Sequence, residues 1–168
     1  MAISIFENAV TQMIVNNVDK WYDGYKNVCV DYVQQAACRY KNGGHGVVDL
    51  VVHIYLPNKP CAGNQYNFEI KSSSGDLNSG NGLNLYGMYN YLVYPRSPIT
   101  TLPGAITREM VEQKLASVGC DHVGIIAIVS DDDFVVERKA RRYSGDGMPN
   151  KVKAHKHKKS CFGSTQCS

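Results

Sequence analysis

Three residues of the chain have the types and the spacing that metal-assisted chemistry needs. Asp49 interrupts the apolar run over residues 47–56, and Glu69 and Lys71 lie two residues apart in the next such run. Residues i and i+2 of a β-strand point to the same face, so Glu69 and Lys71 share one. A carboxylate within an apolar strand is costly unless it is paired or bound to a metal. Two such acids on neighbouring strands therefore favour a bound cation.

Mg²⁺ fits these residues, because it prefers oxygen ligands and is often held by one or two carboxylates and several waters. Asp49 and Glu69 would be direct ligands, and the backbone carbonyl of Ile70 would supply a third oxygen. Bound Mg²⁺ acidifies a water and neutralises charge that develops on a phosphoryl group. Lys71 would orient or deprotonate that water, or stabilise the charge, and the sequence leaves these roles open. The alternative is an ordinary Glu–Lys ion pair at a sheet edge.

The flanking sequence predicts the strands that must position these residues. Alternating or continuous apolar runs with many β-branched and aromatic residues indicate strands. The runs over 47–56 and 66–71 are separated by a short loop with two prolines, which predicts two adjacent strands. The further strands are expected over residues 28–40, 91–94, 123–129 and 134–136.

Helices are predicted on either side of these strands. Apolar residues at spacings of three and four predict a helix over 3–22, with Glu7 near the edge of its buried stripe. Residues 105–118 predict another, with Thr107 as N-cap. Residues 72–84 predict a loop leading into a short helix, for which Asp76 is either a cap or a catalytic acid. The chain thus reads as an α/β protein with a mixed central sheet flanked by helices.

The site residues also carry a family resemblance. Asp49 followed by Glu69-Ile70-Lys71 resembles the D…(D/E)xK signature of the PD-(D/E)XK nuclease superfamily. Residues 69–77 resemble the E-[IV]-K-x-S-x-x-D-[FL] stretch of its small phage-borne and MmcB-like members. The resemblance covers about residues 3–142, and its specific motifs lie within 49–95. Val48 stands where many members have proline, and the glutamine that some resolvase-like members carry on the following helix has no equivalent.

The resemblance implies a single restriction-endonuclease-like domain over residues 1–142 that acts as a Mg²⁺-dependent endonuclease, a phosphodiester hydrolase of DNA. Mn²⁺ would substitute for Mg²⁺. A homodimer is compatible with it, because members that cut both strands commonly dimerise. Glu7 matches a first-helix acid that often contributes an outer ligand. The residues that would contact nucleic acid are Ser72, Ser73, Arg138, Lys139, Arg141 and Arg142.

The distribution of charge separates the chain into an acidic body and a basic end. Residues 1–137 hold nine Lys and Arg against fourteen Asp and Glu, a net of −5, whereas residues 138–168 hold nine against one, a net of +8. Residues 143–168 lack periodicity and predict a flexible basic tail. The tail either binds a polyanion such as DNA or only solubilises the protein.

The remaining composition predicts a soluble intracellular protein, and the resemblance to phage-borne members implies the cytoplasm of a bacterial or phage-infected cell. Hydrophobic residues make up 43% of the chain, enough to bury a sizeable core. Neither a secretory signal nor a run of about 20 apolar residues is visible. The six cysteines form no CxxC pair, which favours free thiols over a disulfide framework.

Two other functional classes remain open from the sequence. The first is a nucleic-acid-binding module that keeps the nuclease fold without turnover. The second is a structural or regulatory phage protein that makes protein contacts. Metal-dependent cleavage separates the nuclease from both, and DNA binding without cleavage separates the first from the second.

Overall fold

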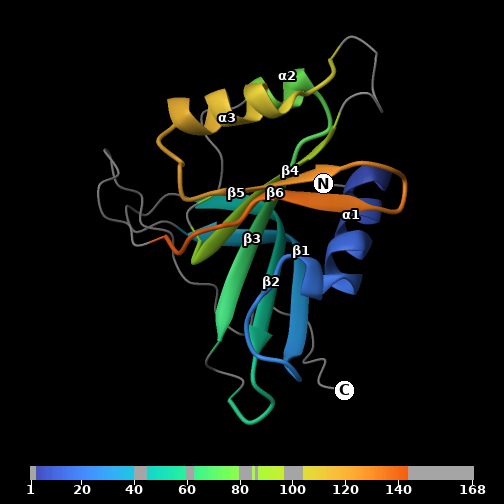
Figure 1. Cartoon of the computed structure of the whole chain (residues 1–168). Coiled ribbons are helices and arrows are strands. Elements are labelled where there is room, and N and C mark those ends of the chain that lie inside the picture. The colour runs from blue at the N-terminus through green and yellow to red at the C-terminus, as the bar shows by residue number, and fades with distance from the viewer. Residues whose placement is uncertain are drawn as a thin grey trace.

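The apolar runs of the sequence form six strands, and these lie in the sheet in the order in which they occur in the chain. The computed structural model describes residues 3–39, 45–59, 63–79, 85, 87–96 and 104–143. They make one α/β domain with a mixed open sheet and three helices (Figure 1). The strands are β1 (Cys29–Arg39), β2 (His45–Tyr55), β3 (Asn64–Ile70), β4 (Tyr89–Pro95), β5 (Gly124–Ile128) and β6 (Phe134–Arg138).

The sheet combines both kinds of pairing. Strands β1, β2 and β3 are antiparallel neighbours, as β5 and β6 are, whereas β3, β4 and β5 run parallel. Strand β3 therefore has a hydrogen-bonded neighbour on each side. Glu69 therefore does not lie at a sheet edge, where the alternative interpretation placed the Glu–Lys pair.

The helices begin at the side-chain caps that the sequence offers. Ser4 caps α1 (Ile5–Asn16) by accepting a hydrogen bond from the Glu7 N–H, and Thr107 caps α3 (Arg108–Ser117) as expected. The helix expected over 3–22 instead ends at Asn16, because Asn17 leaves helical dihedrals and donates its amide to the Met13 carbonyl. A short 3₁₀ turn, η1 (Val18–Lys20), follows. The short helix expected after β3 is α2 (Ser74–Asn78).

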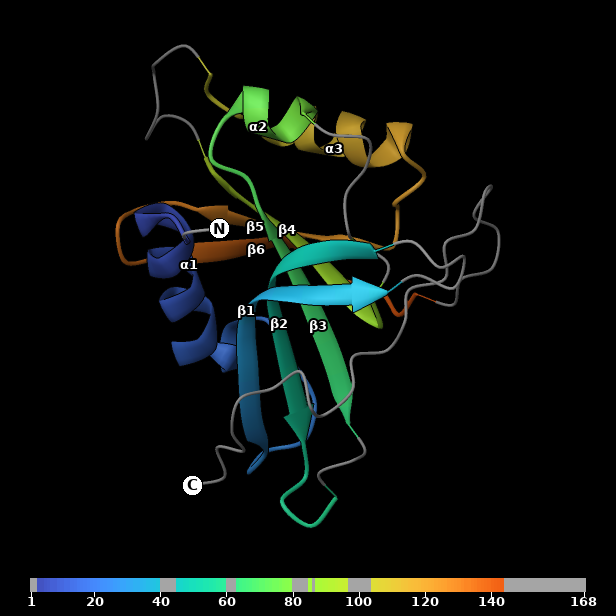
Figure 2. The same cartoon turned by 180° about the vertical axis from the view of Figure 1, so that it is seen from behind.

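Alternation along the central strands sorts their side chains into two cores, one on each face. Figures 1 and 2 show α1 against one face of the sheet and α2 with α3 against the other. Phe68, Tyr91 and Ile126 pack with α1, whereas Leu92 and Ile125 pack with the other two helices. The single domain thus has three layers.

Trp21 connects α1 to the sheet. Its ring is almost fully buried and makes edge-to-face contacts with Tyr66, Phe68 and Tyr91, and its indole N–H donates to the Ile14 carbonyl. Both its apolar surface and its one polar atom are therefore satisfied inside the core.

Several expectations from the sequence are settled or limited by the structure. Cys29 is disulfide-bonded, so the expectation of free thiols is wrong for this residue, whereas Cys120 is a buried thiol that donates to the Val118 carbonyl. Within the described ranges, no helix is long and apolar enough to cross a membrane. The basic tail lies outside the described residues from residue 144 onward.

Replacing Trp21 with alanine tests its role in holding α1 on the sheet. We expect Trp21→Ala to lower the free energy of unfolding by about 3–5 kcal/mol, the usual cost of removing a large buried aromatic side chain. Urea titration of the purified protein measures it. Tyr25→Ala is the matched control, because Tyr25 is 75% exposed, and its effect should stay within about 0.5 kcal/mol. Equal effects of the two substitutions would contradict this account.

Candidate active site

Asp49 and Glu69 face each other where β2 and β3 separate. The antiparallel register ends at Leu50 opposite Phe68, so one further step places Asp49 opposite Glu69. Side chains that are directly opposite in an antiparallel pair lie on the same face of the sheet. The sequence prediction that these two acids lie side by side on neighbouring strands is confirmed.

The Asp49 carboxylate takes over the hydrogen bond that β2 no longer makes to β3. Its Oδ2 accepts from the Ile70 N–H at 2.8 Å. Burial raises the pKa of Asp49, and the hydrogen bond from Ile70 and the positive charge of Lys71 oppose that rise. Asp49 thus has two functions in the structure, as a backbone acceptor and as a mostly buried charge. The Ile70 carbonyl expected as a metal ligand belongs to the same residue, and its ligand role stays a prediction.

Glu69 and Lys71 form a buried ion pair. Lys71 Nζ lies 3.3 Å from Glu69 Oε1, and each residue is only 8% exposed. Burial raises the pKa of Glu69 to about 7, and the Asp49 charge adds to the rise while Lys71 opposes it. The second oxygen, Glu69 Oε2, is buried without a hydrogen-bond partner. An unpartnered buried carboxylate oxygen beside a second acid is the arrangement that a cation would complete.

The start of α2 closes this end of the site. Ser73 is the N-cap and accepts from the Asp76 N–H, while Asp76 Oδ2 accepts from the Ser72 N–H at 3.0 Å. Asp76 is therefore not itself the N-cap, but it supports the cap from the first turn. Its Oδ1 also lies 3.8 Å from Lys71 Nζ. The structure thus brings Ser72 and Ser73 to the end of β3, beside Glu69 and Lys71, and their contact with nucleic acid stays a prediction.

Glu7 approaches the acids from the first turn of α1 through a residue that the sequence analysis did not select. Gln35 Nε2 lies 3.1 Å from Glu7 Oε2 and 3.3 Å from Asp49 Oδ1. Burial and the Asp49 charge raise the pKa of Glu7. The signal for Gln35 was available, because it belongs to a pair of glutamines inside an otherwise largely apolar strand.

The carboxylate oxygens are suitable ligands for a hard cation, although the described residues do not surround such a cation with ligands on all sides. Within the described parts of the chain, no group of three or more His, Cys, Asp or Glu side chains is placed to hold a metal ion. Asp49 and Glu69 would instead supply two oxygens, an arrangement that suits Mg²⁺ because it keeps several waters. The free Glu69 Oε2 and the mutual repulsion of the two acids are the features that favour a cation here.

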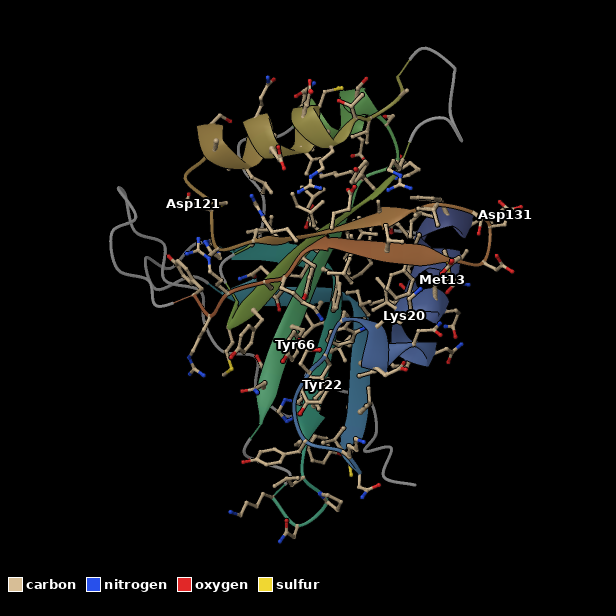
Figure 3. All side chains as sticks on the ribbon, viewed as in Figure 1. Met13, Lys20, Tyr22, Tyr66, Asp121 and Asp131 are labelled. Carbon is tan, nitrogen blue, oxygen red and sulfur yellow. The ribbon has the colours of Figure 1, made fainter. Side chains whose placement is uncertain are left out.

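The four basic residues expected to bind nucleic acid lie apart from the acids. Arg138 is the last residue of β6 and the other three follow it toward the amino ends of β4 and β5, whereas Glu69 and Lys71 lie at the carboxyl end of β3. Figure 3 shows Asp121 and Asp131 at opposite ends of this part of the sheet, and Arg141 donates to the Asp121 carbonyl. Their contacts with the protein differ: Arg138 is half-buried on the Val123 carbonyl, Lys139 pairs with Asp23, and Arg141 and Arg142 are exposed.

Comparison of the chain with protein-family models, with curated proteins and with solved structures gives no match. The interpretation of the candidate site therefore rests on the residues and the geometry of this chain alone.

The raised pKa of Glu69 makes the stability of the fold depend on pH. Its pKa of about 7 exceeds the ordinary value of 4.5, so the folded protein holds this proton more tightly than the unfolded chain does. The resulting stabilisation is fully present below pH 4.5 and is lost as the pH rises through 7. Relative to Glu69→Gln, metal-free wild-type protein should lose at most about 3 kcal/mol of stability over this window.

Urea titrations at about pH 4.5 and about pH 8 measure this difference. Glu112→Gln is the control, because Glu112 is an exposed acid paired with Arg108 on α3 and its loss leaves Glu69 in place. The same pH dependence in wild type and in Glu69→Gln would show that Glu69 does not titrate as described.

Proposed function

We propose that this protein is a Mg²⁺-dependent endonuclease that hydrolyses phosphodiester bonds in DNA. The observation that carries the proposal is the unpartnered, buried Glu69 Oε2 beside Asp49, with the Lys71 amine 3.3 Å from the other Glu69 oxygen. The site holds two carboxylates but only one ammonium group, so one negative charge is not balanced by the side chains that the structure describes. Such a site suits a reaction that uses a divalent metal and an anionic substrate. When bound, Mg²⁺ would supply an acidified water and neutralise charge on the phosphoryl group.

The protein residues have separate roles in this reaction. Asp49 and Glu69 bind the metal, and the Ile70 N–H holds the Asp49 carboxylate in one orientation. Lys71 is held between Glu69 and Asp76. An ammonium group in ion pairs donates hydrogen bonds, so stabilising a phosphoryl oxygen fits its position better than removing a proton from water.

The fold supports a restriction-endonuclease-like assignment. A helix, three antiparallel strands, a short helix and a parallel strand follow in that order, and both site segments lie where β2 and β3 part. The exposed Arg141 and Arg142 beyond β6 lie away from the acids, so a nucleic acid that reached both would extend across the sheet. That extent favours a polymer over a small phosphate ester as the substrate.

Conservative substitutions at the three central residues test the chemistry. Asp49→Asn keeps an oxygen that accepts the Ile70 N–H, and Glu69→Gln and Lys71→Met keep the side-chain volume while removing charge. We expect each to reduce cleavage by about a hundredfold or more, and the triple variant to be little worse than the singles. The assay is a panel of linear, nicked, flapped and four-way-junction DNA with Mg²⁺ or Mn²⁺.

Asp131→Asn and Lys114→Met are the matched controls, because both residues are charged and lie outside the candidate site. They should cleave as the wild type does. Wild-type protein that binds DNA but cleaves no substrate with either metal would favour the inactive binding module instead. Full activity in Lys71→Met would remove the lysine from the mechanism.

The contribution of the basic residues to DNA binding is a separate question. We expect Arg141→Ala with Arg142→Ala to weaken binding to duplex DNA and to flatten the slope of log K against log salt by about 2, if each residue neutralises one phosphate. Single-turnover cleavage at saturating enzyme should change little. Fluorescence anisotropy over a series of salt concentrations gives the slope, and Lys114→Ala is the control. An unaltered slope would place the DNA-contacting surface elsewhere.

A further inference from the structure

Gln35 adopts a backbone conformation that a residue with a side chain rarely takes inside a strand. Its φ is 52°, in the left-handed region, which costs an L-residue other than glycine about 1–2 kcal/mol. The pairing of β1 with β2 is interrupted at the same place, because Gln34 pairs with Leu50 and Ala36 with Val48, while Gln35 opposite Asp49 has no partner in the register. Figure 2 shows both strands changing direction in mid-course.

The Gln35 side chain contacts two acids that belong to different elements. Its amide nitrogen lies 3.1 Å from Glu7 Oε2 on α1 and 3.3 Å from Asp49 Oδ1 on β2. An amide NH₂ group has two hydrogens, so it can donate one to each carboxylate. The Gln35 amide thus lies between the two negative charges.

We propose that Gln35 is a positioning residue that holds Glu7 and Asp49 together in the arrangement that binds the metal. The inference rests on the proposed function, because it assumes that Asp49 is a metal ligand and that Glu7 assists it. Glycine would adopt this backbone conformation without strain, so the strain is accounted for by what the glutamine side chain does. Side chains that orient metal ligands in this way commonly contribute a factor of about 10–100 to metal affinity.

A purely structural role predicts a different result. Gln34, the preceding residue, also links β1 to α1, since its Nε2 donates to Thr11 Oγ1 at 3.1 Å. Thr11 is buried and uncharged, so this bond holds the helix without touching an acid. Gln34→Ala therefore removes one hydrogen bond between the same two elements and leaves the site intact.

The experiment measures Mn²⁺ affinity by calorimetry and the melting temperature of the metal-free protein. Gln35→Gly should lower Mn²⁺ affinity about tenfold or more while its melting temperature stays the same or rises, because the backbone strain is relieved. Gln35→Asn keeps an amide and a residue that tolerates left-handed backbone, but it is one methylene shorter, and it should lose affinity as well. Gln34→Ala should lower the melting temperature and keep wild-type affinity.

The outcomes distinguish this inference from the proposed function. Wild-type Mn²⁺ binding with unchanged affinity in Gln35→Gly would overturn the role of Gln35 and leave the metal site standing. An equal loss of affinity in Gln34→Ala would also overturn it, because the link between β1 and α1, and not the amide beside the acids, would then explain the loss. A wild-type protein that binds no Mn²⁺ would overturn the proposed metal site itself.

Discussion

The arrangement of side chains at the carboxyl end of β3 depends on the repulsion between two buried carboxylates. Asp49 and Glu69 occupy the first open step of the β2–β3 ladder, and burial raises the pKa of both. Three groups offset the repulsion: the Lys71 ammonium, the Ile70 N–H and the Gln35 amide. They come from β1, from the last residue of β3 and from the residue that follows it, and they leave one oxygen of the two carboxylates, Glu69 Oε2, without a partner.

Local chemistry explains why much of this was predictable from the sequence. Strand periodicity of two places Glu69 and Lys71 on one face whatever the rest of the fold does, and apolar runs separated by a short loop predict adjacent strands. Thr107 was identified as an N-cap because capping depends on a hydroxyl and the next few N–H groups alone. These features require no knowledge of distant contacts.

What the sequence did not predict depends on packing between distant segments. Gln35 looks like an ordinary strand residue until the interrupted register turns its amide toward Glu7 and Asp49. The burial of both Glu69 and Lys71 was not predicted either, since it involves the start of α2, where Asp76 Oδ1 lies 3.8 Å from the Lys71 amine. The disulfide at Cys29 was likewise not predicted, because the spacing of the six cysteines alone does not reveal a pairing.

The central place of β3 determines how the site responds when the molecule opens locally. Amide protons of a strand that is bonded on both sides exchange with solvent only in the largest unfolding events, whereas short peripheral helices detach more readily. Helix α2 spans only five residues, so we expect it to be among the elements that unfold locally most often. We therefore expect the amide of Glu69 to exchange among the slowest in the protein, and local opening of α2 to expose the Lys71 amine without moving the strand that carries Glu69.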